Sequence, residues 1–238
     1  MSVGAVIFSR YSSMRLPGKA LLDIGGRPLL GRVIDRSRLI KGIDRIIIAS
    51  STDVEDDSIC QFAKAEGIEV YRGSLGNVTE RALDACDAFK LTRFARICGD
   101  RPFFDPDLVA KLIKLHAKFD LDVATTTFPN TFAPGLAAEV ISVEALRRLS
   151  SLVVKDDDKE HVTKYFYDHA QKFSIKNIEN SSKINMRGLH LAVDEMVDLE
   201  RARWIAAQVE NGDGCLSPMS QIISYARAWD ELNQRKCL

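Results

Sequence analysis

Short apolar segments alternate along the first half of the chain with segments that carry the spacing of an amphipathic helix. The strand-like runs are rich in β-branched and aromatic residues and occupy residues 3–8, 45–49, 69–71, 94–98 and 122–127. Between them apolar residues recur three or four positions apart, as in Leu29, Val33 and Ile34. Strands such as residues 46–48 have no polar face to offer water, so both of their faces must be covered. This pattern predicts an α/β fold with a mainly parallel central sheet and helices on both faces.

The second half of the chain follows a looser pattern. Turn residues accumulate from about Thr126 to Pro134 and Gly135, before a short strand-like run at residues 137–142. We expect a small insertion or lid over about residues 126–175. The remaining order predicts a helix from about Val143, an acidic loop at residues 156–158, a helix from about His161, a strand near residues 189–193 and two closing amphipathic helices.

Length and charge limit the domain organisation and the partners. The chain has 238 residues and shows no internal repeat, low-complexity tract or linker, so we expect one domain over residues 1–238. Lys plus Arg and Asp plus Glu both number 33, so the formal net charge is zero. Such a chain lacks the basic field that holds a nucleic-acid backbone, and we expect no nucleic-acid partner.

The composition predicts a cytoplasmic protein. Its five cysteines are scattered and form no CxxC pair, which is typical of reduced thiols. The N-terminal segment enters an apolar run directly, without a charged leader or a cleavage site. No apolar stretch approaches the roughly 20 residues that cross a bilayer, so no membrane insertion is expected.

Basic and hydroxyl side chains gather in the segment RYSSMRLPGK, directly after the first predicted strand. It holds Arg10, Ser12, Ser13, Arg15 and Lys19. Ligands of parallel α/β sheets bind at the carboxyl ends of strands, and a triphosphate of about four negative charges suits a loop that offers hydroxyls, backbone N–H groups and cations. Three basic residues in ten also fit a surface turn, but the position after a strand favours phosphate binding. Neither the P-loop pattern GxxxxGK[ST] nor the dinucleotide pattern GxGxxG is present.

This segment, continued as LLDIGGRPLLGRVIDR, resembles the opening of the cytidylyltransferases that activate acidic sugars. These are the 3-deoxy-manno-octulosonate and acylneuraminate types and the related spore-coat polysaccharide biosynthesis group, to which the chain is most similar. The resemblance implies a Rossmann-like nucleotidyltransferase fold. It also implies that Arg10, Ser12, Ser13, Arg15 and Lys19 hold the triphosphate and ribose of CTP, with Arg10 and Lys19 acting in catalysis.

Two further segments extend the resemblance. IIIASSTDVEDDSI is similar to the family's strand with an ATD-like turn, and YRGSLGNVTERALDA is similar to a stretch that lies beside the nucleotide. The second match implies that Asn77, Thr79, Glu80 and Arg81 contact the nucleotide. Without the resemblance, Thr79 and Glu80 are explained as the first turn of a helix, and both interpretations stay open here.

Two aspartates are the candidates for a magnesium site. Asp100 follows the strand at residues 94–98 and should project into the crevice that holds the phosphates. A carboxylate beside polyphosphate needs a cation between them, and Mg²⁺ takes one or two carboxylates together with phosphate and water oxygens. LHLAVDEMVDLERAR resembles the family's V-D-T-x-x-D-L motif, which implies Asp194 as the second ligand. Asp194 also fits a helix N-cap, and Asp198 a capping or supporting role.

The acceptor side of the site is predicted from weaker matches. KEHVTKYFYDHA puts His161 and Tyr165 on one helix face if the segment is helical, and it resembles stretches that contact the sugar. With PGLAAEV, it implies Glu139, Glu160, His161 and Tyr165 as sugar-side residues. Glu139 is also explained as an ordinary strand residue. Arg101 departs from the family, in which a small residue, Cys or Glu is common, and it suits either a substrate carboxylate or a neighbouring acid.

These residues predict a cytidylyltransferase that transfers CMP from CTP to an acidic or nonulosonic sugar for surface polysaccharide synthesis, and the family implies a homodimer. One alternative is a nucleotidyltransferase for another base or a polyol phosphate, whose glycine-rich opening is missing here. Another is a glycosyltransferase, for which Asp105 and Asp107 form a D-x-D candidate. A nucleotide-sensing binding protein is the third, and the presence of Asp100 and Asp194 argues against it.

Overall fold

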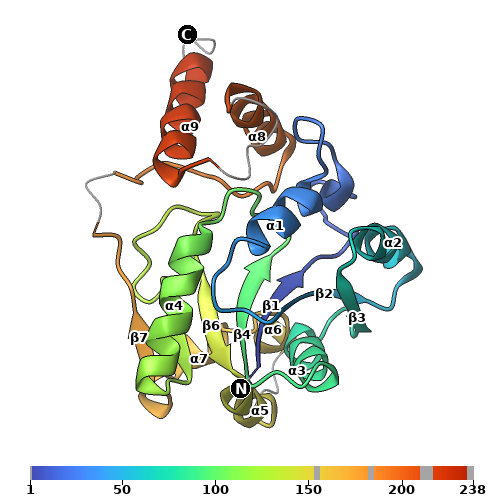
Figure 1. The fold of residues 1–238 in the computed structure, drawn as a ribbon, viewed down its shortest axis with the longest axis vertical. Helices are drawn as coiled ribbons and strands as arrows, with labels where there is room; N and C mark the ends of the chain where they lie inside the picture. Colours follow the sequence, from blue (N-terminus) through green and yellow to red (C-terminus); the bar gives the residue numbers. More distant parts are fainter. Residues whose placement is uncertain (1, 153–155, 182–184, 210–216, 235–238) are drawn as a thin grey trace.

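The computed structural model describes residues 2–152, 156–181, 185–209 and 217–234, and its described strands form one seven-stranded sheet (Figure 1). The strand order is β3-β2-β1-β4-β6-β5-β7. Their bounds are β1 Val3–Phe8, β2 Arg45–Ser51, β3 Glu69–Gly73, β4 Arg93–Cys98, β5 Val123–Thr125, β6 Glu139–Ser142 and β7 Ile175–Asn177. β6 runs antiparallel to β4 and β5, and the other described pairs are parallel. The predicted mainly parallel α/β sheet is confirmed.

Helices connect the strands and extend the chain beyond the sheet. The α-helices are α1 Leu29–Ser37, α2 Asp57–Ala65, α3 Val78–Ala88, α4 Pro106–Phe119, α5 Val143–Ser150, α6 Asp156–Glu160, α7 Lys164–Asp168, α8 Met196–Gln208 and α9 Met219–Gln234. Asp105 is the N-cap of α4, where its side chain accepts from the backbone N–H groups of Asp107 and Leu108. No described helix is long and apolar enough to span a bilayer.

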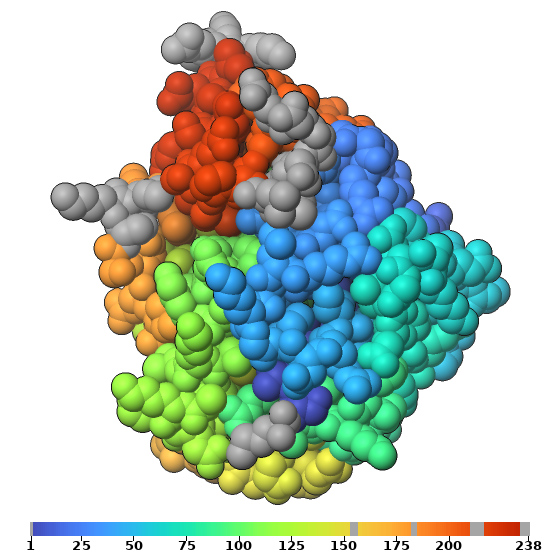
Figure 2. All heavy atoms as spheres, in the orientation of Figure 1, coloured from blue at the N-terminus to red at the C-terminus, as the bar shows by residue number. Residues whose placement is uncertain are grey.

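The two faces of the sheet carry separate apolar clusters because successive side chains of a strand point to opposite faces. On one face Ile7 and Ile48 are buried in a cluster with residues of α1, α2 and α4. On the other, Val6 and Ile47 share a cluster with residues of α3 and α5. Each fully buried side chain of this kind contributes roughly 1.5–3 kcal/mol to folding. The space-filling view shows α1, α2 and α4 closing over the first face (Figure 2).

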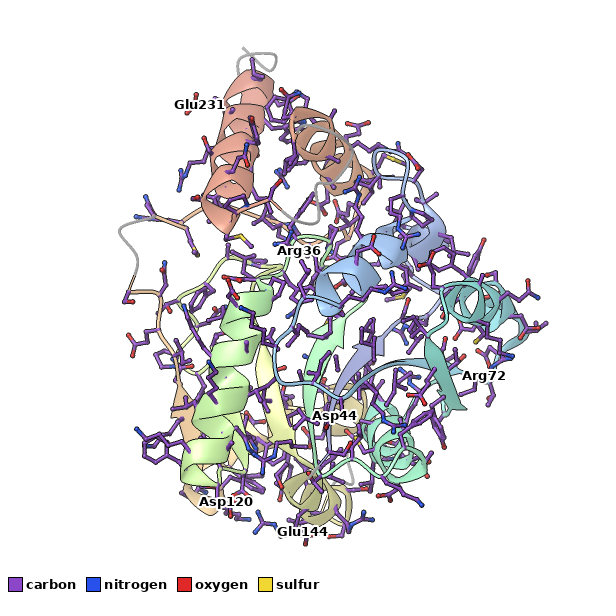
Figure 3. All side chains as sticks on the ribbon, viewed as in Figure 1. Arg36, Asp44, Arg72, Asp120, Glu144 and Glu231 are labelled. Atoms are coloured by element: carbon purple, nitrogen blue, oxygen red, sulfur yellow. The ribbon has the colours of Figure 1, made fainter. Side chains whose placement is uncertain are left out.

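A buried arginine joins α1 to the segment that leads into α4. Arg36, labelled in Figure 3, is 3% exposed, and its Nε donates to the carbonyl oxygen of Phe104 at 2.6 Å. A buried guanidinium needs such acceptors, since an unsatisfied donor costs about 1–3 kcal/mol. The contact therefore fixes α1 against the chain that follows β4.

The two closing helices build a third apolar cluster beyond the carboxyl edge of the sheet (Figure 1). Leu199 of α8 and Ile222 of α9 are buried there together with Phe103 and Leu191. The C-terminal helices thus pack on the rest of the protein. Their cluster includes the segment that leads into Asp194, so it supports that part of the chain.

The chain reverses its course across the sheet between β1 and β4. From β1 it moves outward through β2 and β3, and it then returns to add β4 on the other side of β1. Phe8 at the end of β1 pairs with Cys98 at the end of β4, so the segments that start at Ser9 and Gly99 leave the sheet side by side. Such a reversal leaves a crevice at the carboxyl ends of both strands.

Three local expectations were wrong. Residues 189–193 form no strand; they are an extended segment held by the Leu191 N–H to the Pro134 carbonyl and the Val193 N–H to the Asp100 carbonyl, both at 2.8 Å. The acidic residues 156–158 begin a short helix, α6, instead of a loop. The helix predicted from His161 begins at Lys164, so His161 and Tyr165 do not share a helix face.

These differences from the expected elements arise from tertiary contacts and from ion pairs. No described strand runs beside residues 189–193, so they bond to loops. Lys164 at the start of α7 pairs with Asp158 of α6 at 3.3 Å and with Asp168 of its own helix at 2.5 Å. The three-residue strand β7 at the sheet edge carries no pattern that the sequence alone resolves. The division of the chain into one domain with a lid over residues 126–175 stays a prediction, and β6 from that range lies inside the sheet.

Gly135 is required by a close backbone approach, which gives a testable prediction. It has φ of 95°, and an added Cβ would lie 2.4 Å from the carbonyl carbon of Leu191. Gly26 also has positive φ, 81°, but an added Cβ there would meet nothing within 4 Å. We expect Gly26→Ala to cost about 1–2 kcal/mol of unfolding free energy, from backbone strain alone, and Gly135→Ala to cost about twice that or more, because backbone must also move.

Urea unfolding of the two variants beside the wild type measures this difference. Gly135→Ala should also displace the backbone that leads to Asp194, because Leu191 lies in the segment that ends at Asp194. Equal destabilisation by the two substitutions would show that the contact between Gly135 and Leu191 is unimportant.

Candidate functional site

A cleft of about 400 Å³ opens at the carboxyl ends of β1 and β4. Gly99 allows the two strand ends to approach, because an added Cβ there would lie 2.9 Å from Cβ of Ser9 and 3.0 Å from the carbonyl oxygen of Phe8. Ten of the predicted site residues line the cleft: Arg10, Ser12, Ser13, Arg15, Lys19, Arg81, Asp100, Glu160, His161 and Asp194. The fold therefore brings together five segments that are separated in the sequence.

The loop after β1 is fixed to β2 by a buried carboxylate. Asp56 is 1% exposed, and its Oδ1 accepts from the backbone N–H of Tyr11 at 2.6 Å. Its Oδ2 accepts from the Ser51 N–H and the Ser50 hydroxyl, both at 2.9 Å. The Tyr11 carbonyl in turn accepts from the N–H groups of Ser13 and Gly18. Asp56 thus holds the basic loop in the shape that directs its side chains into the cleft.

Lys19 is the centre of an ion cluster at the cleft wall. Its Nζ donates to Asp194 Oδ1 at 3.0 Å, to Asp100 Oδ2 at 3.3 Å and to the Val193 carbonyl at 2.7 Å. Arg15 Nη2 lies 3.1 Å from the same Asp194 oxygen. Burial raises the pKa of Asp194, but the Lys19 contact and the charges of Lys19 and Arg15 outweigh it and hold that pKa below its ordinary value.

Asp194 is positioned by the start of α8. The N-cap of this helix is Glu195, and Asp198 completes a capping box. Asp198 Oδ2 accepts from the N–H groups of Asp194 and Glu195, both at 3.0 Å. Asp194 itself is therefore free of the capping task, and its carboxylate faces the cations. The capping or supporting role expected of Asp198 matches these contacts.

Arg81 is a buried cation in the cleft. Its side chain comes from the first turns of α3 and is 2% exposed, with Nη1 donating to the Ser74 carbonyl at 2.6 Å. Burial and the nearby charge of Arg10 lower the pKa of Arg81 to about 10. Opposite it, Arg10 Nη2 pairs with Glu160 Oε1 at 3.2 Å across the cleft.

The remaining predicted residues lie outside the lining of the cleft. Asn77 caps α3 by accepting from the Glu80 N–H, and the buried Thr79 hydroxyl donates to the Asp158 carbonyl. Arg101 donates to the Ala137 carbonyl, and the Tyr165 ring packs edge-on against His169 with centroids 4.2 Å apart. Their roles toward nucleotide and sugar stay predictions.

Glu139 lies beneath the cleft and holds an arginine that sequence reasoning missed. It is 5% exposed, and its Oε2 accepts from Arg96 Nη1 at 2.8 Å, while Tyr167 donates to Oε1 at 2.7 Å. Burial raises the pKa of Glu139, but the Arg96 charge and the Tyr167 hydroxyl bring it below its ordinary value. Arg96 and Cys98 both line the cleft. They lie four and two positions before Asp100, and the two-residue period of a strand could have revealed them.

The aspartate pair fits the donor set of a magnesium site. Both carboxylates reach one cationic atom, Lys19 Nζ, within 3.3 Å, so they converge on a single point. No group of three or more His, Cys, Asp or Glu residues converges anywhere in the described ranges. Two carboxylates with open positions suit Mg²⁺, which takes its other oxygens from phosphate and water, and do not suit a closed structural zinc site.

Comparison with known proteins decides the family. A family model described as cytidylyltransferase matches residues 5–205. The chain belongs to the cytidylyltransferase family. The matched range includes every predicted site residue and ends within α8, so α9 lies beyond it.

Individual relatives agree with the family. The spore coat polysaccharide biosynthesis protein SpsF of Bacillus subtilis is 31% identical over 201 residues, which cover 82% of each chain. A 3-deoxy-manno-octulosonate cytidylyltransferase of Haemophilus influenzae is 26% identical over 225 residues, covering 89% of this chain and 82% of that enzyme. A solved cytidylyltransferase from Leptospira borgpetersenii shares the fold, with a TM-score of 0.88 at 24% identity over 97% of this chain and 96% of that one. The predicted cytidylyltransferase resemblance and the Rossmann-like nucleotidyltransferase fold are confirmed, and the protein is a nucleotidyltransferase.

The role of Asp56 leads to a prediction about the basic loop of this cytidylyltransferase. The amide of Asp56→Asn has one acceptor oxygen, so either the Tyr11 N–H or the Ser51 N–H loses its partner. A buried N–H without an acceptor costs about 1–3 kcal/mol. We expect CTP to bind about tenfold or more weakly, measured by calorimetric titration.

Asp57→Asn is the matched control. Asp57 is the next residue, its side chain is 46% exposed, and it pairs with Arg72 away from the loop. This substitution should leave CTP affinity within about twofold, since exposed pairs contribute only about 0–1 kcal/mol. Equal losses in both variants would refute the positioning role of Asp56.

The pH dependence of stability follows from the same carboxylate. Burial raises the pKa of Asp56, but hydrogen bonds from Ser51, the Tyr11 N–H and Ser50 bring it below its ordinary value of 3.8. A folded-state pKa below that of the unfolded chain adds stability above about pH 4, which is lost as pH falls toward the folded value. We expect the unfolding free energy of Asp56→Asn to fall less steeply below pH 4 than that of the wild type, measured by urea unfolding across pH.

Proposed function

We propose that the protein transfers CMP from CTP to a hydroxyl of an acidic sugar and releases pyrophosphate. One observation carries this proposal: the basic loop after β1 and the aspartate pair meet in one cleft, joined by Lys19. Cations for a polyphosphate and carboxylates for a divalent metal are the two requirements of nucleotidyl transfer. The family match supports CTP as the nucleotide, and the names of the relatives support a sugar acceptor.

The chain's own residues bind and align the triphosphate. Arg10, Arg15 and Lys19 offer cationic donors along the loop, and the hydroxyls of Ser12 and Ser13 lie among them. The acceptor hydroxyl attacks the α-phosphorus and gives up its proton to solvent water, a new P–O bond to the sugar forms, and the bond to the pyrophosphate oxygen breaks. Catalysis of this kind depends on alignment and on neutralising the charge that builds up on the leaving group.

Asp100 and Asp194 are the residues that would hold Mg²⁺ in this reaction. When bound, the ion neutralises charge on the phosphate oxygens and makes the α-phosphorus a better electrophile. Asp198 keeps the backbone of Asp194 in place. The backbone bond from Val193 to Asp100 keeps the two carboxylates at a fixed separation.

The acceptor is proposed to lie on the side of the cleft formed by Arg96, Cys98, Glu160 and His161. The guanidinium of Arg96 is held by the buried carboxylate of Glu139, so it is a preorganised donor for an acidic sugar. Surface polysaccharide synthesis is proposed as the use of the product, in line with the spore coat relative. The expected homodimer and cytoplasmic location stay predictions.

Pyrophosphate release tests the proposal directly. The purified protein is incubated with Mg²⁺, each of the four nucleoside triphosphates, and a panel of 2-keto-3-deoxy acids and neutral and amino sugars. We expect turnover with CTP and an acidic sugar. Absence of release with every combination of CTP and acid contradicts the acceptor assignment, and equal turnover with another nucleotide contradicts cytidine as the preferred base.

Asp100→Asn tests the metal role in the same assay. We expect kcat to fall by at least about a hundredfold, because the amide no longer neutralises or holds the cation. Asp107→Asn is the control, since Asp107 lies in the first turn of α4 outside the cleft, and it should retain wild-type turnover. Full activity of Asp100→Asn would rule out Asp100 as a metal ligand.

A further inference from the structure

A lysine side chain takes up the position that a metal ion would need. Lys19 Nζ donates to the Val193 carbonyl at 2.7 Å, to Asp194 at 3.0 Å and to Asp100 at 3.3 Å. An ammonium group has three N–H donors, so all three are engaged. The Lys19 side chain is only 14% exposed, which limits the screening of these contacts by water.

The proposed function gives Lys19 two tasks that exclude each other. In catalysis it binds the triphosphate, whereas in the structure its ammonium holds the same oxygens that would bind the divalent cation. A dication on either carboxylate would lie within a few ångströms of the ammonium. The metal ion and the ammonium are both positive, and at such a short separation in a partly buried site they repel each other strongly. Lys19 therefore has to leave the aspartates before a metal ion can be held between them.

We propose that Lys19 keeps the aspartate pair closed to divalent metal until CTP draws its ammonium onto the triphosphate. This inference rests on the proposed function and adds the order in which the site assembles. The nucleotide supplies phosphate oxygens and at the same time uncovers the carboxylates of Asp100 and Asp194. Arg15 makes the same exchange from the rim, where its side chain is 59% exposed and lies 3.1 Å from Asp194.

The contact of Lys19 with the two aspartates also affects the enzyme when neither nucleotide nor metal is bound. Two carboxylates that converge on one point repel each other, and the Lys19 ammonium compensates this repulsion without metal. The cleft is thus held ready for CTP. Because coupling between two ligands is reciprocal, metal and CTP raise each other's affinity by the same factor.

Simple chelation is the competing explanation. Phosphate oxygens of bound CTP attract a metal ion whatever Lys19 does, so nucleotide-dependent metal binding by the wild type does not separate the two explanations. Chelation predicts that neutralising Lys19 leaves the metal affinity of the nucleotide-free protein unchanged. Exclusion by Lys19 predicts a gain. The nucleotide-free metal affinity is the quantity that decides.

The experiment is a Mn²⁺ titration of the full chain without nucleotide, with free Mn²⁺ measured by electron paramagnetic resonance. We expect Lys19→Met to bind Mn²⁺ about tenfold or more tightly than the wild type, within the usual range of coupling between sites. Lys41→Met removes the same charge from an exposed turn before β2, at the opposite edge of the sheet, and should not change the affinity. Adding Asp194→Asn to Lys19→Met should remove the gain.

Equal Mn²⁺ affinity of the wild type and Lys19→Met without CTP would overturn the inference, as would a gain that survives Asp194→Asn. If thermal unfolding shows that Lys19→Met does not fold, Lys19→Gln replaces it, since its amide keeps a donor for the Val193 carbonyl. CTP titrated into the wild type with and without Mg²⁺ separates the two proposals. No CTP binding under either condition contradicts the proposed function, whereas CTP binding with an Mn²⁺ affinity of the nucleotide-free protein that Lys19→Met leaves unchanged contradicts the role of Lys19 alone.

Discussion

The contact of one lysine with two aspartates is the interaction on which the site depends. Two carboxylates that lie together repel each other, and in this structure the Lys19 ammonium compensates that repulsion between Asp100 and Asp194. In the proposed reaction, the same three side chains are expected to bind the phosphates and the metal ion. Arg15 joins the cluster from the rim of the cleft. The positive charges of Lys19 and Arg15 both lower the pKa of Asp194.

Backbone hydrogen bonds around this cluster hold its carboxylates in place. The Val193 N–H bonds to the Asp100 carbonyl, and the Leu191 N–H bonds to the Pro134 carbonyl, where Gly135 leaves room for the approach. Asp198 fixes the start of α8. The apolar cluster of α8 and α9 covers this segment from outside. The last two helices thus support the extended segment that places Asp194.

The floor of the cleft rests on a second buried ion pair, between Arg96 and Glu139. The two residues face each other across the antiparallel pairing of β4 and β6, so sheet register alone brings them together. Tyr167 adds a hydroxyl to the same carboxylate. A buried pair of this kind costs desolvation energy that only close geometry and extra hydrogen bonds offset, and its retention beside a ligand cleft suits a role in orienting Arg96.

The sequence by itself determined the parallel sheet, the basic loop after β1 and the two aspartates, because these depend on local signals: apolar runs that need cover on both faces and charged residues at strand ends. It could not determine the course of residues 189–193, the break between α6 and α7, or the partners of Asp56 and Arg96. Those depend on which segments lie side by side after folding. The extended segment before Asp194 has the pattern of a strand but finds only loops to bond with. Likewise, the charge of Lys19 is visible in the sequence, but only the tertiary structure places it between Asp100 and Asp194, because long-range backbone bonds set the distance between the two carboxylates.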